Sequence, residues 1–151
     1  MEEALTKFEV SHTYITPVSD SDLGAMLVDV AAQQRDLAAL QQYAPLAEQL
    51  ASHSGHALYQ AVAHRAWGVA HRLAGEYAEA NIRLQQALEL FQALDTRWQI
   101  GRTLYELAEL AVARAEISAA RDYFSQALMA FEEMKAAPDA ARVRAAMEVL
   151  D

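Results

Sequence analysis

Residues 61–94, which read AVAHRAWGVAHRLAGEYAEANIRLQQALELFQAL, carry the pattern that predicts the fold. The pattern indicates two helices separated by a break at Ala74-Gly75. Gly68 in the first helix and Ala80 in the second have almost no side chain, so the two backbones can approach closely there. Three bulky side chains can fill the space around that contact: Trp67, Tyr77 and Leu84. Such a hairpin buries only part of its apolar surface and needs stacked neighbours.

The same pattern recurs at an interval of 40 residues. Towards the C-terminus, Gly68 becomes Ala108 and Trp67 becomes Leu107. The second helix keeps its order of small and large residues, since Ala80, Asn81, Leu84, Ala87 and Leu88 become Ala120, Arg121, Phe124, Ala127 and Leu128. Towards the N-terminus the match is looser, because Val28 and Leu40 occupy positions that are small in the other copies. We therefore predict an all-α protein of stacked antiparallel helix hairpins.

An acidic residue also recurs where each second helix is expected to begin. These residues are Asp36, Glu76 and Glu116. A carboxylate at a helix N-terminus can accept hydrogen bonds from free backbone N–H groups and interacts favourably with the positive end of the helix dipole. The recurrence supports the predicted helix starts.

The arrangement of small and large residues resembles the tetratricopeptide (TPR) repeat, and the resemblance covers residues 23–150. It implies a right-handed TPR-like superhelix of about three repeats followed by a C-terminal capping helix. The interval of 40 residues exceeds the usual ~34. Together with the string Leu90-Phe91-Gln92-Ala93-Leu94-Asp95-Thr96, it is similar to long-helix arrays attached to bacterial signalling ATPases, cyclases and transcription regulators. The resemblance therefore implies a regulatory or scaffolding role.

The expected organisation is an N-terminal stump or linker over residues 1–20 and a TPR-like domain over residues 21–150. Its repeats are expected at about 21–53, 54–94 and 95–134, with a capping helix at 138–150. A loop is expected at Ser52–Gly55, and Asp95 is expected to cap the helix that starts at Thr96. Pro45 is expected to kink the helix that contains it. The string Ala4-Leu5-Thr6-Lys7-Phe8 resembles Ala87-Leu88-Glu89-Leu90-Phe91, so residues 1–10 either belong to an earlier repeat or match by chance.

Composition excludes several classes of function. The formal net charge of −9 opposes contact with nucleic acid or an anionic membrane, because both require a basic surface. The chain has no cysteine, so disulfides and thiolate metal sites are absent. No apolar run is long enough for a membrane span, and the N-terminus does not have the pattern of a signal peptide. We expect a cytoplasmic protein without a cofactor or metal.

In TPR proteins the first helix of each repeat lines a concave face that holds a partner segment. By this resemblance the lining residues are Asp29, Arg65, Val69, Arg72, Arg102, Tyr105 and Glu109. The Lys and Asn residues with which some family members clamp a terminal carboxylate are absent, since Ala25, Asp29, Ala66, Tyr105 and Glu109 stand in their places. The arginines could pair with acidic side chains of a ligand and Tyr105 could stack on it. The alternative is a row of solvated charges without a binding role.

Other candidate sites are weaker. His64 and His71 share one helix face and are expected to be packing residues, while His53 and His56 lack nearby acids for a metal site. Glu106 and Glu109 are expected to face solvent, and no catalytic motif is present. Trp98 is expected either in the core or as an exposed interface anchor, with the core favoured.

The sequence thus favours a non-enzymatic module that binds a protein or peptide partner. One alternative is homo-oligomerisation, in which the imperfect first repeat, with Val28 and Leu40 in place of small residues, pairs with a second copy. Another is a small-molecule receptor or an enzyme that uses the helical groove.

Overall fold

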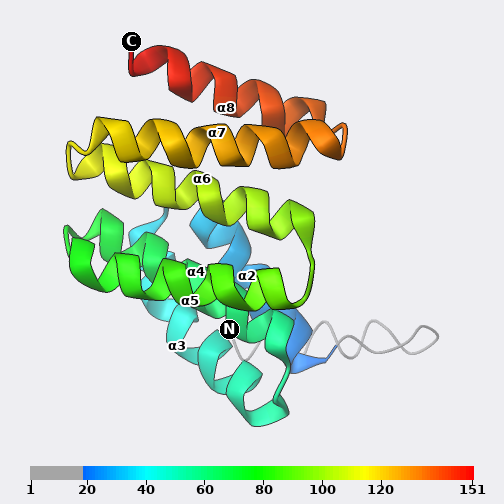
Figure 1. Ribbon diagram of the computed structural model, residues 1–151. Coiled ribbons are helices and arrows are strands. Elements are labelled where there is room, and N and C mark those ends of the chain that lie inside the picture. Colours follow the sequence, from blue (N-terminus) through cyan, green and yellow to red (C-terminus); the bar gives the residue numbers. More distant parts are fainter. Residues whose placement is uncertain (1–18) are drawn as a thin grey trace.

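A computed structural model describes residues 19–151 of the chain, and in this range it contains seven α-helices and no strand (Figure 1). The helices are α2 (Asp20–Gln33), α3 (Leu37–Ser54), α4 (Ala57–Leu73), α5 (Tyr77–Ala93), α6 (Arg97–Ala113), α7 (Ile117–Glu133) and α8 (Ala137–Val149). The predicted all-α class is confirmed. The stump or linker predicted for residues 1–20 lies outside the described residues, apart from Ser19 and Asp20, which begin α2.

Each helix packs against the next one in the chain, and α2 also packs against α4. Figure 1 shows the later helices as layers that follow one another in chain order, with α8 beyond α7 and α7 beyond α6. Neighbouring helices therefore form hairpins that lie against each other, as the repeated pattern predicted. None of the helices between residues 19 and 151 combines the length and apolar character needed to cross a bilayer.

The turns between helices recur every 20 residues. One residue in each turn has a positive φ, namely Arg35, Gly55, Gly75, Asp95, Ala115 and Lys135. A left-handed residue after a helix lets the following N–H groups bond to the last carbonyl groups, as when His56 N donates to the Ala51 oxygen. Only two of the six turns use glycine, the residue that adopts this conformation without a steric penalty.

Two expected helix boundaries are wrong because a left-handed turn residue occupies the position. Asp95 does not cap α6, because it is the left-handed turn residue, and Thr96 occupies the N-cap position. The expected loop at Ser52–Gly55 is mostly helical, since α3 runs to Ser54 and ends only at the left-handed Gly55. Pro45 lies inside α3, which continues through it.

The three recurring acids all occupy N-cap positions, but only one makes the expected capping bond. The Asp36 carboxylate accepts a hydrogen bond from Ala39 N at 3.1 Å. Glu76 and Glu116 make no side-chain capping bond. Their longer side chains instead reach the end of the preceding helix: Glu76 lies 3.2 Å from His71 Nδ1 in α4, and Glu116 lies 3.1 Å from Nε of Arg114, the C-cap residue of α6.

At two glycines a core side chain of the partner helix lies directly against the backbone of the first helix of a hairpin. A Cβ atom placed on Gly68 in α4 would lie 2.5 Å from the Leu84 side chain in α5. One placed on Gly101 in α6 would lie 2.7 Å from the Phe131 ring in α7. Leu84 and Phe131 are buried, so the close approach of the helices brings large core side chains directly against the opposite backbone.

We expect Gly68→Ala to lower the free energy of unfolding by about 1–2 kcal/mol. Overpacking a core costs about 1–3 kcal/mol, and the better helix propensity of alanine offsets up to ~1 kcal/mol of it. Urea unfolding measures the change. In the Leu84→Ala background the obstructing side chain is gone, so Gly68→Ala should there be neutral or stabilising. Equal losses in both backgrounds would contradict the close contact.

Candidate functional site

A cluster of charged side chains joins the first helices of the three hairpins. Asp29 on α2 lies at its centre and binds one arginine from each of the other two helices. Its Oδ1 accepts from Arg65 Nη2 on α4 at 3.2 Å. Arg102 on α6 donates from Nη2 to Oδ1 at 2.8 Å and from Nη1 to Oδ2 at 3.0 Å. The two parallel bonds fix both the distance and the orientation between α2 and α6.

Arg65 is the most deeply buried member of this cluster, with 1% of its surface exposed. Its Nη1 also lies 3.4 Å from the Gln99 carbonyl oxygen and from Thr103 Oγ1, and its guanidinium lies 4.9 Å from the centre of the Phe91 ring. Burial and the nearby charge of Arg102 lower the pKa of Arg65 to about 10, against the opposing effect of Asp29. Arg65 therefore stays charged at neutral pH and depends on its internal partners.

A second cluster lies further along the same three helices. Glu106 on α6 accepts Arg35 Nη1 from the end of α2 at 2.8 Å and Arg72 Nη2 from α4 at 3.1 Å. Arg72 Nη1 lies 3.4 Å from Glu109, so Arg72 bridges two carboxylates. The prediction that Glu106 faces solvent is wrong, because only 7% of it is exposed. Arg72 and Arg35 compensate its charge, as a buried carboxylate requires.

Burial alone would raise the pKa of Asp29, but the hydrogen bond and charge of Arg102 and the charge of Arg65 outweigh burial and hold it below its usual 3.8. Burial and the nearby carboxylate of Glu109 raise the pKa of Tyr105 to about 12. The Tyr105 hydroxyl is therefore a hydrogen-bond donor and acceptor throughout the neutral range.

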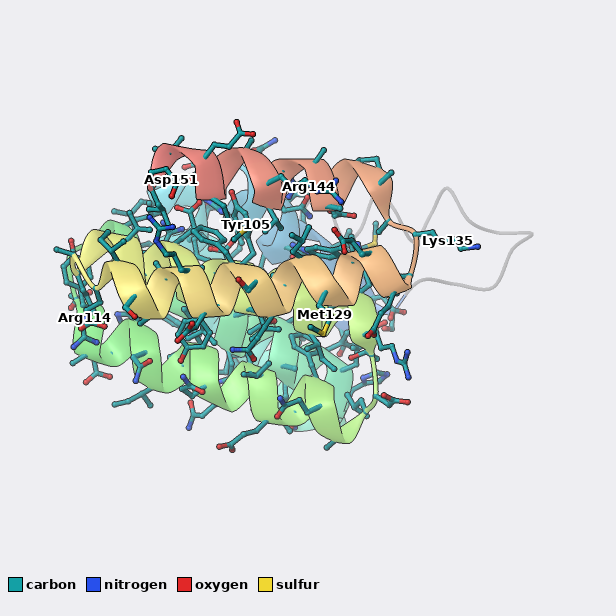
Figure 2. All side chains as sticks on the ribbon, turned by 45° about the horizontal axis from the view of Figure 1, so that its top comes forward. Tyr105, Arg114, Met129, Lys135, Arg144 and Asp151 are labelled. Atoms are coloured by element: carbon teal, nitrogen blue, oxygen red, sulfur yellow. The ribbon has the colours of Figure 1, made fainter. Side chains whose placement is uncertain are left out.

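An open groove of about 430 Å³ runs beside these clusters, between α2, α6 and α8. Its lining consists of Gln33, Arg35, Arg102, Tyr105, Glu106, Glu109, Phe131, Asp139 and Arg142. Figure 2 shows Tyr105 between the ribbons of α7 and α8, and its ring lies edge-on to Phe124 of α7 at 5.5 Å between centres. Arg142 on α8 keeps more than half of its side chain exposed while it donates to Asp139 at 3.2 Å.

The structure separates the seven residues expected on the concave face. Arg102, Tyr105 and Glu109 line the groove, and Asp29 lines a neighbouring pocket of about 390 Å³. Arg65 and Val69 are buried, so their expected role as exposed lining residues is wrong. The expectation failed because Arg65 is held by partners on both α2 and α6, while Val69 belongs to the apolar core that α4 shares with α2, α3 and α5. Arg72 belongs to the second charged cluster, where it is bound to Glu106 and only 10% of its side chain is exposed.

Sequence reasoning missed Arg35, Asp139 and Arg142 as neighbours of the groove. Arg35 lies in the left-handed turn that follows α2, and its side chain lines the groove. Asp139 accepts a hydrogen bond from Trp98 Nε1 at 3.1 Å, which ties α8 to α6. Trp98 itself is 43% exposed, and the Arg102 guanidinium lies 4.9 Å from its ring centre, so its expected place in the core is wrong.

His64 and His71 are partly buried, as expected of packing residues, whereas His53 and His56 are exposed. His71 stacks on Trp67 with 5.6 Å between ring centres, and burial and the charge of Arg83 lower the pKa of His64. Within residues 19–151 no three potential metal-ligating acids, histidines or cysteines come together. Val28 and Leu40, the large residues that make the first repeat imperfect, are both fully buried.

Protein-family models and curated proteins were compared with the chain, and neither comparison found a match.

We expect Arg65→Ala to lower the free energy of unfolding by about 3–5 kcal/mol, because it removes a large, fully buried side chain together with one of the two arginine partners of Asp29. Urea unfolding followed by circular dichroism measures the loss. Arg142→Ala, which removes an exposed arginine, should change the stability by less than about 0.5 kcal/mol. A loss below about 1 kcal/mol for Arg65→Ala would show that the internal ion pair is unimportant.

Asp29 should make stability depend on pH in the acid range. Because its folded pKa lies below the unfolded value near 3.8, its contribution is present above pH 3.8 and is lost as the pH falls towards the folded pKa. The difference in unfolding free energy between the native sequence and Asp29→Asn should be the same at pH 5 and pH 7, and smaller below pH 3.8. A difference that grows on acidification would contradict the lowered pKa.

Proposed function

We propose that this chain is a TPR-like interaction module that binds a segment of a protein partner in the groove between α2, α6 and α8. We further propose that its hairpins follow a right-handed superhelix and that the module serves a regulatory or signalling system. The absence of cysteine is compatible with a reducing compartment such as the cytoplasm. No catalytic role is part of this proposal.

The observation that supports the proposal most is the composition of the groove. Three arginines and three acids line it, and Tyr105 presents an aromatic face and a hydroxyl beside them. Grooves of this kind, concave and bordered by a few polar groups of fixed position, are the usual sites of ligand binding. Tyrosine and arginine are also the residues that most often dominate binding energy at protein interfaces.

The internal ion pairs limit the chemistry of the partner. Arg102 and Arg35 are already bound to Asp29 and Glu106, so they are not free to clamp a strongly acidic ligand. The accessible groups are Arg142, Tyr105 and the partly exposed Glu109. A segment with both an acidic and a basic or hydrogen-bonding side chain suits this set better than a purely acidic one.

Selection from a displayed peptide library tests the proposal with the chain as bait. Peptides that bind should lose affinity at least about tenfold on Tyr105→Ala or Arg142→Ala, a change equivalent to ~1.4 kcal/mol. Ile82→Ala, which truncates an exposed side chain on α5 away from the groove, serves as the matched control and should leave affinity unchanged. Peptides whose binding depends on Ile82 and not on Tyr105 or Arg142 would overturn the groove as the binding site.

A further inference from the structure

A second hollow of about 410 Å³ lies beside the groove, between α6, α7 and α8. We call it the apolar pocket and define it by its aliphatic and phenylalanine lining: Val112, Phe124, Ala145, Ala146, Val149 and Leu150. Phe124 is buried, whereas Val112 is 38% exposed and Val149 is 86% exposed. The pocket therefore combines a buried aromatic ring with large apolar side chains that remain in contact with water. A large apolar side chain that entered it would shield both from solvent.

The repeat register explains why this space is open and apolar. Its residues Val112, Ala146 and Val149 lie 40 positions after three members of the second charged cluster, which are Arg72, Glu106 and Glu109. Between α4 and α6 those long side chains bind each other, with distances of 3.1 Å and 3.4 Å from the arginine to the two carboxylates. Valine and alanine are shorter and uncharged, so they leave the corresponding space between α6 and α8 unfilled. Helix α4 also packs against α6, whereas the main neighbour of α8 is α7.

The apolar pocket is continuous with the groove. Tyr105, Glu109 and Arg142 line both. The Glu109 side chain is 31% exposed and the Arg142 side chain is 59% exposed, so both keep accessible surface at the boundary besides their internal contacts. A ligand that occupies both spaces must therefore be apolar at one point and offer hydrogen-bonding groups beside it.

A protein segment meets this requirement. Every residue of a peptide except proline carries a backbone N–H donor and a C=O acceptor. The peptide units beside an apolar side chain can therefore donate to the Glu109 carboxylate and accept from the Arg142 guanidinium. An acyl chain offers no group for either charge, and its terminal carboxylate is disfavoured by the formal net charge of −9.

We propose that the apolar pocket holds one large aliphatic or aromatic side chain of the partner, while the adjoining residues of that segment lie in the groove. The inference rests on the proposed binding of a protein segment and adds the residue class that the segment must carry. A side chain that fills a pocket of this kind commonly supplies a large share of the binding energy at an interface.

Two variants alter the pocket in different ways. Val112→Arg combined with Ala146→Glu fills it with the residue types that stand one repeat earlier. Val149→Asp places a charge at its most exposed apolar residue, where folding is not at risk. Val30→Asp on α2 is the matched control, because Val30 is 50% exposed and lines neither the pocket nor the groove. Circular dichroism checks that each variant has the helix content of the native chain.

The probes are the peptides from the display selection, together with copies in which one large apolar residue is replaced by alanine. In the native chain, one such replacement should weaken binding at least about tenfold by calorimetry. In the filled variant, the parent peptide and its alanine copy should bind equally, to within about twofold, because the contact is already lost. Val149→Asp should weaken the parent peptide by at least about threefold, and Val30→Asp should leave its affinity unchanged.

The outcomes separate this inference from the proposed function. Peptides that lose affinity on Arg142→Ala, but bind the native and pocket-altered chains equally, would overturn the apolar pocket and leave the groove as the binding site. Peptides that depend on neither the groove nor the pocket would overturn both. A dimer in light scattering that Val149→Asp converts to a monomer would assign the pocket to a second copy and overturn its role in binding a partner.

Discussion

The close approach of two helices in the hairpins α4–α5 and α6–α7 is the contact on which the rest of the structure depends. At Gly68 and Gly101 the absence of a Cβ atom lets Leu84 and Phe131 lie directly against the opposite helix. These contacts set the distance between the first and second helices of a hairpin. That distance in turn sets where the other side chains of the first helix meet the next hairpin. Because interiors are close-packed, even one added methyl group at such a point forces neighbouring atoms to move.

The buried ion pairs fix a different geometry, that of the three first helices relative to each other. Asp29 holds both Arg65 and Arg102, and Glu106 holds both Arg35 and Arg72. Removing charges from water is costly, so such clusters are poor contributors to net stability compared with apolar contacts. Their geometric demands are strict, however, because a two-bond arginine–carboxylate contact tolerates little displacement. This network also engages Arg35 and Arg102, two of the three arginines that line the groove, so a ligand would meet a small set of accessible groups around Tyr105.

The turns recur every 20 residues although most of them place a non-glycine residue in the unfavourable left-handed conformation. Four of the six left-handed turn residues are not glycine, and each carries the steric penalty of that conformation. The bonds that a left-handed residue permits at the helix end, together with the packing of both flanking helices, compensate for it. The equal spacing of these turns gives α4, α5, α6 and α7 the same length of 17 residues, so that these two hairpins can lie side by side over their whole extent.

The sequence by itself determined the helices, their pairing and the 40-residue interval, because these follow from local propensity and from which residues share a helix face. It placed Gly68, Leu84 and Phe124 correctly in the packed interior. Only the tertiary structure decided which charged residues are buried and which charges they pair with. Asp29 and Arg102 are 73 positions apart in the chain and Arg72 and Glu106 are 34 apart, so helical periodicity carries no information about their meeting. A polar residue on a helix has the same sequence pattern whether water or another charge satisfies it, which is why Arg65 and Glu106 were expected at the surface and lie buried.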